Sequence, residues 1–178
     1  MDPISKFLVS YKIPIGAWGK AFFTFLTDNF NTVLRAFSNG LNFLLDGMVD
    51  GLLLLPPVLL IALIALLAYV LQRSKGLALA VFIGLLFILN QNLWKQTVET
   101  LVLVVAAAAA SMAIGVPLGI WAAHKPKVYR IMLPVLDLMQ TLPTFVYLIP
   151  VLTLFGLGNA PGLIVTIIFV IPTSVRLT

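Results

Sequence analysis

Cysteine is absent from the sequence, and histidine occurs once, at His124. Without thiols the chain can form neither a disulfide bond nor a thiolate metal site, and a single imidazole cannot build a metal centre. Charged residues make up only 10% of the chain, whereas ordinary soluble domains contain about 25%. We therefore expect no metal ion and no cofactor, and too few charged side chains to cover the surface of a soluble protein.

Apolar residues, by contrast, make up 61% of the chain, and four stretches carry no charge at all: 51–72, 76–94, 100–123 and 138–175. Such stretches are typical of an integral membrane protein. The net charge of +5 does not indicate a nucleic-acid partner, because the basic residues fall in short clusters between the apolar runs. Membrane lipid is the partner that the composition predicts.

The uncharged stretches predict about five transmembrane helices. Since a bilayer core is about 30 Å thick, each crossing needs about 20 helical residues. Three crossings are expected at Leu52–Leu71, Leu77–Leu89 and Leu101–Ala123, of which the second is short for a span. The stretch 138–175 is too long for one crossing, and the turn-forming residues GLGNAPG at 156–162 divide it into two. The predicted fold class is all-α, a polytopic membrane helix bundle.

The basic residues of the connecting loops predict the orientation. If the five helices alternate in direction, one side of the membrane receives six of the seven Lys and Arg residues after Asp50: Arg73, Lys75, Lys125, Lys127, Arg130 and Arg176. Lys95, close to Glu99, falls on the other side. Positively charged loops stay in the cytoplasm. We therefore expect the N-terminus outside the cell and the C-terminus inside.

Residues 1–50 are expected to form an extracytoplasmic or interfacial segment, followed by a transmembrane domain at 51–178. The segment contains an amphipathic helical pattern: Phe30, Val33, Leu34, Phe37, Leu41, Leu44 and Leu45 on one face, and Asn31, Arg35, Ser38, Asn39 and Asn42 on the other. Asp28 or Asn29 is the expected N-cap. Such a helix either lies along the membrane surface or packs on the helical bundle.

The third predicted crossing is rich in small residues, and Gly115 and Gly119 form a GxxxG pair within it. Small side chains allow the backbones of two membrane helices to approach closely. The pair therefore predicts helix packing, either within this chain alone or at an interface shared with another subunit.

The stretch DLMQTLPTFVYLIP at 137–150 interrupts an otherwise apolar region. Proline removes a backbone donor and breaks or kinks a helix, and protein or water must satisfy the carbonyls that it frees. The stretch predicts a helix break near Leu142–Pro143, which is either a structural kink or part of a translocation path and its gate. The candidate path and gate residues are Asp137, Gln140, Thr141, Pro143, Thr144 and Tyr147.

No enzymatic motif accompanies these residues. The sequence contains no GxxxxGK[ST] phosphate-binding loop, since Gly19 and Lys20 are followed by alanine, and it shows no pairing of a nucleophile with a histidine. Asp137 and Glu99 are expected on opposite sides of the membrane, so they form no carboxylate pair. We predict no catalytic residue in this chain.

Three stretches resemble one known family. LDLMQTLPTFVYLIPVLTLFGLGNAPGLIVTIIFVIPTSVRLT at 136–178 closely resembles the permease subunit of ABC importers for glycine betaine, proline and choline, the ProW-like and choline-permease group. The preceding ETLVLVVAAAAASMAIGVPLGIWAAHKPKVYRIMLPVLD at 99–137 is similar to the family's helix and loop, and KIPIGAWGKAFFTFLTDNF at 12–30 to its N-terminal tail. The resemblance covers nearly the whole chain.

The resemblance implies the N-terminal part of a type I ABC importer permease in the bacterial inner membrane. Its partners would be a second permease copy, an ABC ATPase subunit that hydrolyses ATP, and an extracytoplasmic substrate-binding protein. The family's coupling loop would begin just after Arg176, whereas the sequence stops at Thr178, so we expect a permease domain that is incomplete at its C-terminus.

Two other interpretations stay open at this point. One is a secondary transporter or channel that works without an ATPase, and the other is a truncated membrane fragment that transports nothing. The residues do not select among glycine betaine, choline and proline as the solute.

Overall fold

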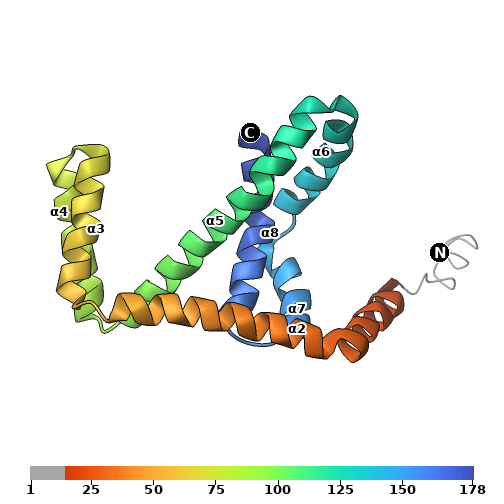
Figure 1. Cartoon of the computed structure of the whole chain (residues 1–178), viewed down its shortest axis with the longest axis horizontal. Coiled ribbons are helices and arrows are strands. Elements are labelled where there is room, and N and C mark those ends of the chain that lie inside the picture. Colours follow the sequence, from red (N-terminus) through yellow and green to blue (C-terminus); the bar gives the residue numbers. More distant parts are fainter. Residues whose placement is uncertain (1–14) are drawn as a thin grey trace, which may run out of the picture.

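The computed structural model describes residues 15–178, and these residues form helices and no strand. The predicted all-α fold class is therefore confirmed for this part of the chain. Residues 1–14 of the predicted N-terminal segment lie outside the described residues. The helices follow in the order α2 (Ile15–Leu53), α3 (Pro57–Gln72), α4 (Lys75–Asn90), α5 (Trp94–His124), α6 (Pro126–Thr141), α7 (Thr144–Phe155) and α8 (Asn159–Leu177) (Figure 1).

Helix α2 is one helix of 39 residues, so the predicted start at Asp28 or Asn29 is wrong. The Asn29 amide donates to the carbonyl of Phe25 at 2.8 Å, and the Thr27 hydroxyl donates to that of Phe23 at 2.8 Å. Both side chains therefore bond one turn back inside the helix and cap nothing. No proline occurs within α2 to remove a backbone donor, and the helix also continues beyond residue 50.

Helix α2 runs across the lower ends of α5, α7 and α8 (Figure 1). Leu45 and Val49 are buried there in a cluster that includes Val98 of α5. The side chains of Phe30 and Val33 are exposed, at 47% and 66%. One side of the helix thus packs on the bundle, but the predicted faces are wrong in part, because Ser38 of the predicted polar face is buried while Phe37 of the predicted apolar face is 55% exposed. The other apolar side of the helix is open, and placement of that side at a membrane surface stays a prediction.

Helices α3 and α4 form a hairpin that stands at one end of α2 (Figure 1). The expected first span is wrong at its start, because Leu52 and Leu53 continue α2 and the chain bends by 97° before Pro57, the first residue of α3. Pro57 fits this position because its missing N–H would have no partner there. The hairpin turns at Arg73, which has a φ of 53°, and the Ser74 hydroxyl accepts from the N–H of Leu77 at 3.4 Å.

Helices α5 and α8 form the main packing interface of the bundle. The side of α5 that faces inward carries its buried residues, which are Trp94, Val98, Val102, Ala107, Ser111, Gly115, Gly119 and Ala122. A Cβ atom added to Gly115 would lie 2.5 Å from Cβ of Ser174, and one added to Gly119 would lie 2.8 Å from the carbonyl oxygen of Val175. The two glycines therefore bring the backbones of α5 and α8 into direct contact, within this chain.

The predicted number of five crossings is not confirmed. Among the described residues, α5 and α8 alone are long and apolar enough to span a membrane as single helices. The pairs α2 with α3 and α6 with α7 qualify only if each bent pair counts as one span. Helices α3 and α4 have 16 residues each, or about 24 Å at 1.5 Å per residue, against a bilayer core of about 30 Å.

Candidate functional site

The helix break predicted in the stretch 137–150 is present. Helix α6 ends at Thr141, α7 begins at Thr144, and the two helices are bent by 91°. Leu142 has an extended backbone with a ψ of 133°. This is expected for a residue before proline, because the proline ring disfavours the helical conformation of the residue that precedes it. Pro143, with a ψ of 138°, has no N–H to return to α6. The two residues together redirect the chain.

Two side-chain contacts join α6, the helix that precedes this break, to α8. The Asp137 carboxylate forms an ion pair with the Arg176 guanidinium group, and the Gln140 amide donates to the Thr173 hydroxyl at 3.3 Å. Within each helix the two residues are three positions apart, or about one turn. The contacts are thus successive rungs between antiparallel helices, and we call these four residues the α6–α8 ladder.

The ladder is accessible to solvent. The side chains of Asp137 and Arg176 are 62% and 35% exposed, and exposed ion pairs are worth about 0.2–1 kcal/mol. Contacts of this strength contribute little to the free energy that holds two helices together. The ladder is therefore a weak polar link between α6 and α8.

Tyr147 connects the two sides of the break. Its hydroxyl donates to the carbonyl of Met139 at 3.0 Å, across the bend from α7 to the last turn of α6. The Thr141 hydroxyl donates to the carbonyl of Leu138 at 3.1 Å and so satisfies a group near the end of α6. Thr144 takes no part in these contacts and lines a hollow between α7 and α8. The candidate gate residues therefore all lie at the break or within the adjoining turns of α6 and α7, and Thr144 differs only in forming none of these side-chain contacts.

The basic residues predicted for one side of the membrane lie on connections or helix ends that share one end of the molecule. The α3–α4 turn, the α5–α6 connection and the C-terminal end of α8 all lie toward the top of Figure 1. These elements carry Arg73, Lys75, Lys125, Lys127, Arg130 and Arg176. Lys95 lies at the opposite end, near the start of α5, with its Nζ 3.8 Å from Glu99. This grouping agrees with the alternation that the orientation argument assumed.

One set of structural contacts near the site was not predicted from the sequence. The turn at 156–158 precedes α8, and the Asn42 side chain of α2 accepts from the N–H of Ala160 at 2.8 Å, while the Asn159 amide donates to Asp46 at 3.3 Å. Asn42 thereby caps α8 from another helix. Its place on the polar face of the predicted amphipathic helix was the available signal, but 118 residues separate the two partners.

We predict that Asn42→Ala lowers the thermal stability of the membrane-extracted protein. Loss of a helix cap costs about 0.5–2 kcal/mol, because an N–H at the start of α8 loses its partner. The measurement is the midpoint of thermal aggregation in detergent. Asn39→Ala is the matched control, since Asn39 is exposed on the same helix and forms none of these contacts. Equal midpoints for the two variants would show that the cap contributes nothing.

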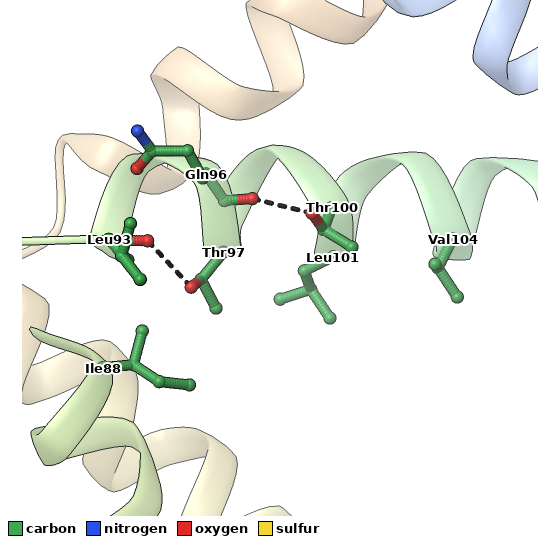
Figure 2. Close-up of a pocket in the computed structure, with 7 residues that line it drawn as sticks. All are labelled: Ile88, Leu93, Gln96, Thr97, Thr100, Leu101 and Val104. Carbon is green, nitrogen blue, oxygen red and sulfur yellow. Dashed lines mark hydrogen bonds between the residues drawn. The ribbon is translucent and has the colours of Figure 1, made fainter. Parts of the chain in front are cut away.

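A second hollow, of about 500 Å³, lies where α4 meets the start of α5 (Figure 2). Its polar residues are largely satisfied within α5, since the hydroxyls of Thr97 and Thr100 donate to the carbonyls of Leu93 and Gln96 at 2.9 and 2.8 Å. Figure 2 shows Thr97, Leu101 and Val104 on the side of α5 that faces Ile88. This hollow is mainly apolar and contains none of the candidate site residues.

Residues 15–178 contain no group of three or more His, Cys, Asp or Glu side chains placed to hold a metal ion. The polar groups around the break form hydrogen bonds and an ion pair between helices.

Comparisons with known proteins bear on the same region. Residues 115–178, which contain the break and the ladder, match the protein family described as "Binding-protein-dependent transport system inner membrane component". This family is defined by a transport component of the inner membrane, and its description names no catalytic activity.

Three curated relatives are each 38% identical to this chain. The glycine betaine transport system permease protein OpuAB of Bacillus subtilis (strain 168) aligns over 94% of this chain and 59% of its own length. The glycine betaine/proline betaine transport system permease protein ProW of Escherichia coli (strain K12) aligns over 100% and 49%. The glycine betaine/carnitine transport permease protein GbuB of Listeria monocytogenes serotype 1/2a (strain 10403S) aligns over 93% and 60%.

These matches confirm the resemblance to the glycine betaine group of permeases. The chain spans about half to three fifths of the length of these relatives. The region of this chain that matches the family is the region in which the structure places the helix break, the ladder and the close contact of α5 with α8.

Proposed function

We propose that this protein is the transmembrane permease subunit of an ATP-driven importer for a compatible solute, either a quaternary ammonium compound such as glycine betaine or choline, or proline. The observation that carries the proposal is the match of 115–178 to an inner-membrane transport component, together with 38% identity to three permeases named for glycine betaine. A broken helix beside a polar ladder, within an apolar bundle, is the kind of element that such a subunit needs.

In this proposal the chain supplies the path, and other subunits supply energy and capture of the solute. The sequence contains no phosphate-binding loop, so ATP is hydrolysed by a separate ABC ATPase subunit. An extracytoplasmic binding protein delivers the solute, and a second permease copy completes the path. The chain lies in the bacterial inner membrane with several crossings.

The gate is proposed at the stretch Asp137–Tyr147. A gate requires an element with two discrete arrangements, and the exposed ladder gives α6 a bonded arrangement on α8 that is weak enough to release. Tyr147 ties the start of α7 to the end of α6, so movement of one passes to the other. A displacement of the C-terminal end of α8 at Arg176 would thus be transmitted to α6 by the ladder, and from α6 to the break.

The proposed function is tested by solute uptake in the native host. Deleting the gene should remove a component of radiolabelled glycine betaine uptake, and restoring it should return that component. Arsenate, which depletes ATP, should stop this uptake, whereas a protonophore given with ATP maintained should not. Uptake that follows the proton gradient would favour the secondary transporter, and uptake unchanged by deletion would favour a fragment that does not transport.

We predict that cysteines at Ser74 and Lys127 are labelled only by thiol reagents that cross the membrane. Both positions lie at the end of the molecule that carries most of the basic residues, and such ends stay in the cytoplasm. The natural chain has no cysteine, so each label reports one position. The control is Lys95→Cys at the opposite end, which an impermeant reagent should label in intact cells. The reverse labelling pattern would show that the orientation is opposite to the one proposed.

A further inference from the structure

The hollow between α7 and α8 lies directly after the helix break. Its volume is about 290 Å³, at the small end of the roughly 300–1,000 Å³ typical of ligand pockets. Two phenylalanines line it, Phe145 from the first turn of α7 and Phe169 from the middle of α8. The remaining lining residues include two threonines, Thr144 and Thr166, and no residue with an ionisable side chain.

Both aromatic rings are exposed in the described chain. Phe145 is 72% exposed and Phe169 is 42% exposed, so neither ring is covered by the rest of the described chain. Aromatic rings attract cations through the negative potential of their faces, and quaternary ammonium groups are the ligands most often bound this way. A hollow between two such rings has the chemistry of a cation site without containing a negative charge.

The polar groups of the hollow discriminate between kinds of cation. The Thr166 hydroxyl donates to the carbonyl of Gly162 at 2.7 Å, and the hydroxyl oxygens of Thr144 and Thr166 are the only side-chain acceptors among the residues that line the hollow. A primary ammonium group has three N–H donors, and each loses a water partner on entry. A quaternary ammonium group has no donor and loses no hydrogen bond. The hollow therefore favours methylated ammonium groups over lysine-like amines.

We propose that this hollow is a binding site for the quaternary ammonium head group of the solute, held by cation–π contacts with the rings of Phe145 and Phe169. The identity of the solute rests on the proposed function, whereas the chemistry of the hollow rests on its own lining residues. Phe145 follows Pro143 by two residues, so a change at the break moves one ring relative to the other on α8. The site would then weaken when the gate changes arrangement.

The test is binding of radiolabelled glycine betaine to the purified chain reconstituted in liposomes. Unlabelled tetramethylammonium should displace it, whereas 3,3-dimethylbutanoate, in which carbon replaces the quaternary nitrogen, should not. Phe145→Leu and Phe169→Leu retain apolar bulk but lose the aromatic face, and each should weaken binding by roughly two- to thirtyfold. Phe145→Tyr should retain binding.

A control variant separates this site from general effects. Phe87→Leu removes an exposed ring from α4, away from the hollow, and should leave binding unchanged. Tetramethylammonium should displace glycine betaine from this variant as it does from the natural chain. Absence of binding by the natural chain, displacement by the carbon isostere, or normal binding by both Phe→Leu variants would each overturn the proposal, leaving a hollow filled by lipid or by another helix.

Failure of this inference and failure of the proposed function give different results. If uptake in the host depends on the gene but both Phe→Leu variants bind and transport normally, the permease assignment stands and the site is wrong. If uptake is independent of the gene while the Phe→Leu variants bind more weakly, the site stands and the transport assignment is wrong.

Discussion

Replacing Gly115 with leucine should prevent the close packing of α5 on α8. A single added Cβ atom would lie 2.5 Å from Cβ of Ser174 and 3.4 Å from backbone atoms of α8, and the rest of the leucine side chain would need still more room. Overpacking of a well-packed site costs about 1–3 kcal/mol, and a clash with a helix backbone lies at or beyond the upper end. We expect a lower thermal midpoint for the protein in detergent and a smaller folded fraction.

Gly119→Leu should have a similar effect, because its added Cβ would lie 2.8 Å from both the carbonyl oxygen of Val175 and Cβ of Thr178. Gly84→Leu is the matched control. Gly84 is also a glycine inside an apolar helix, but nothing lies within 4 Å of the added atom. If the variants at Gly115 and Gly119 are as stable as the one at Gly84, the backbones of α5 and α8 do not meet at this pair.

Replacing Pro143 with alanine should lower solute uptake at least about tenfold while the protein still enters the membrane. Alanine restores a backbone N–H and releases Leu142 from its extended conformation, so α6 and α7 gain access to one continuous helix. A continuous helix would remove the bend that sets Tyr147 against Met139. Removing a proline from a span does not hinder insertion, so lost uptake would report the gate. The measurement is radiolabelled glycine betaine uptake in the native host.

The control for this experiment is Pro134→Ala. Pro134 lies inside α6, where the helix continues without a break, so its replacement should change uptake much less. Abundance of each variant is measured in the same membranes. If the Pro143→Ala variant, the Pro134→Ala variant and the natural protein take up the solute equally, the break is a structural kink without a role in gating.

The ladder provides a companion variant, Gln140→Leu, which should also lower uptake. It removes the donor of the rung to Thr173, so α6 loses one of its two polar contacts with α8. If the rung is the cause, adding Thr173→Val to Gln140→Leu should reduce uptake no further, since the two residues act through one contact. Additive losses would show that Gln140 acts elsewhere in the path.

Local signals in the sequence predicted the helix break and the final turn. Pro143 restricts Leu142 whatever surrounds it, and the glycines at 156 and 158 have φ values of 85° and 138°, which glycine adopts readily. The apolar length of α5 likewise predicted a span. These features depend on residues close together in the chain, so a sequence alone contains them.

The starts of α2 and α3 and the ladder were not predicted, for different reasons. The start of α2 was placed too late because Asn29 looks like a cap, whereas its amide bonds inside the helix. The start of α3 was placed too early. Leu52 and Leu53 are apolar like the residues of α3, so the sequence did not show that they belong to the end of α2. The ladder joins residues 33 and 39 positions apart, and only the packing of α6 against α8 brings them together.

The cap of α8 by Asn42 has a consequence for the order in which the protein is made. Ribosomes synthesise α2 first and α8 last among the described helices, so the acceptor for the N–H of Ala160 exists long before its donor. Backbone donors at a new helix end are costly to leave without a partner near lipid. Helix α8 can therefore complete its first turn on entering the membrane, provided that α2 has already settled against the bundle. A delay in placing α2 would leave the N–H of Ala160 without this acceptor while α8 inserts.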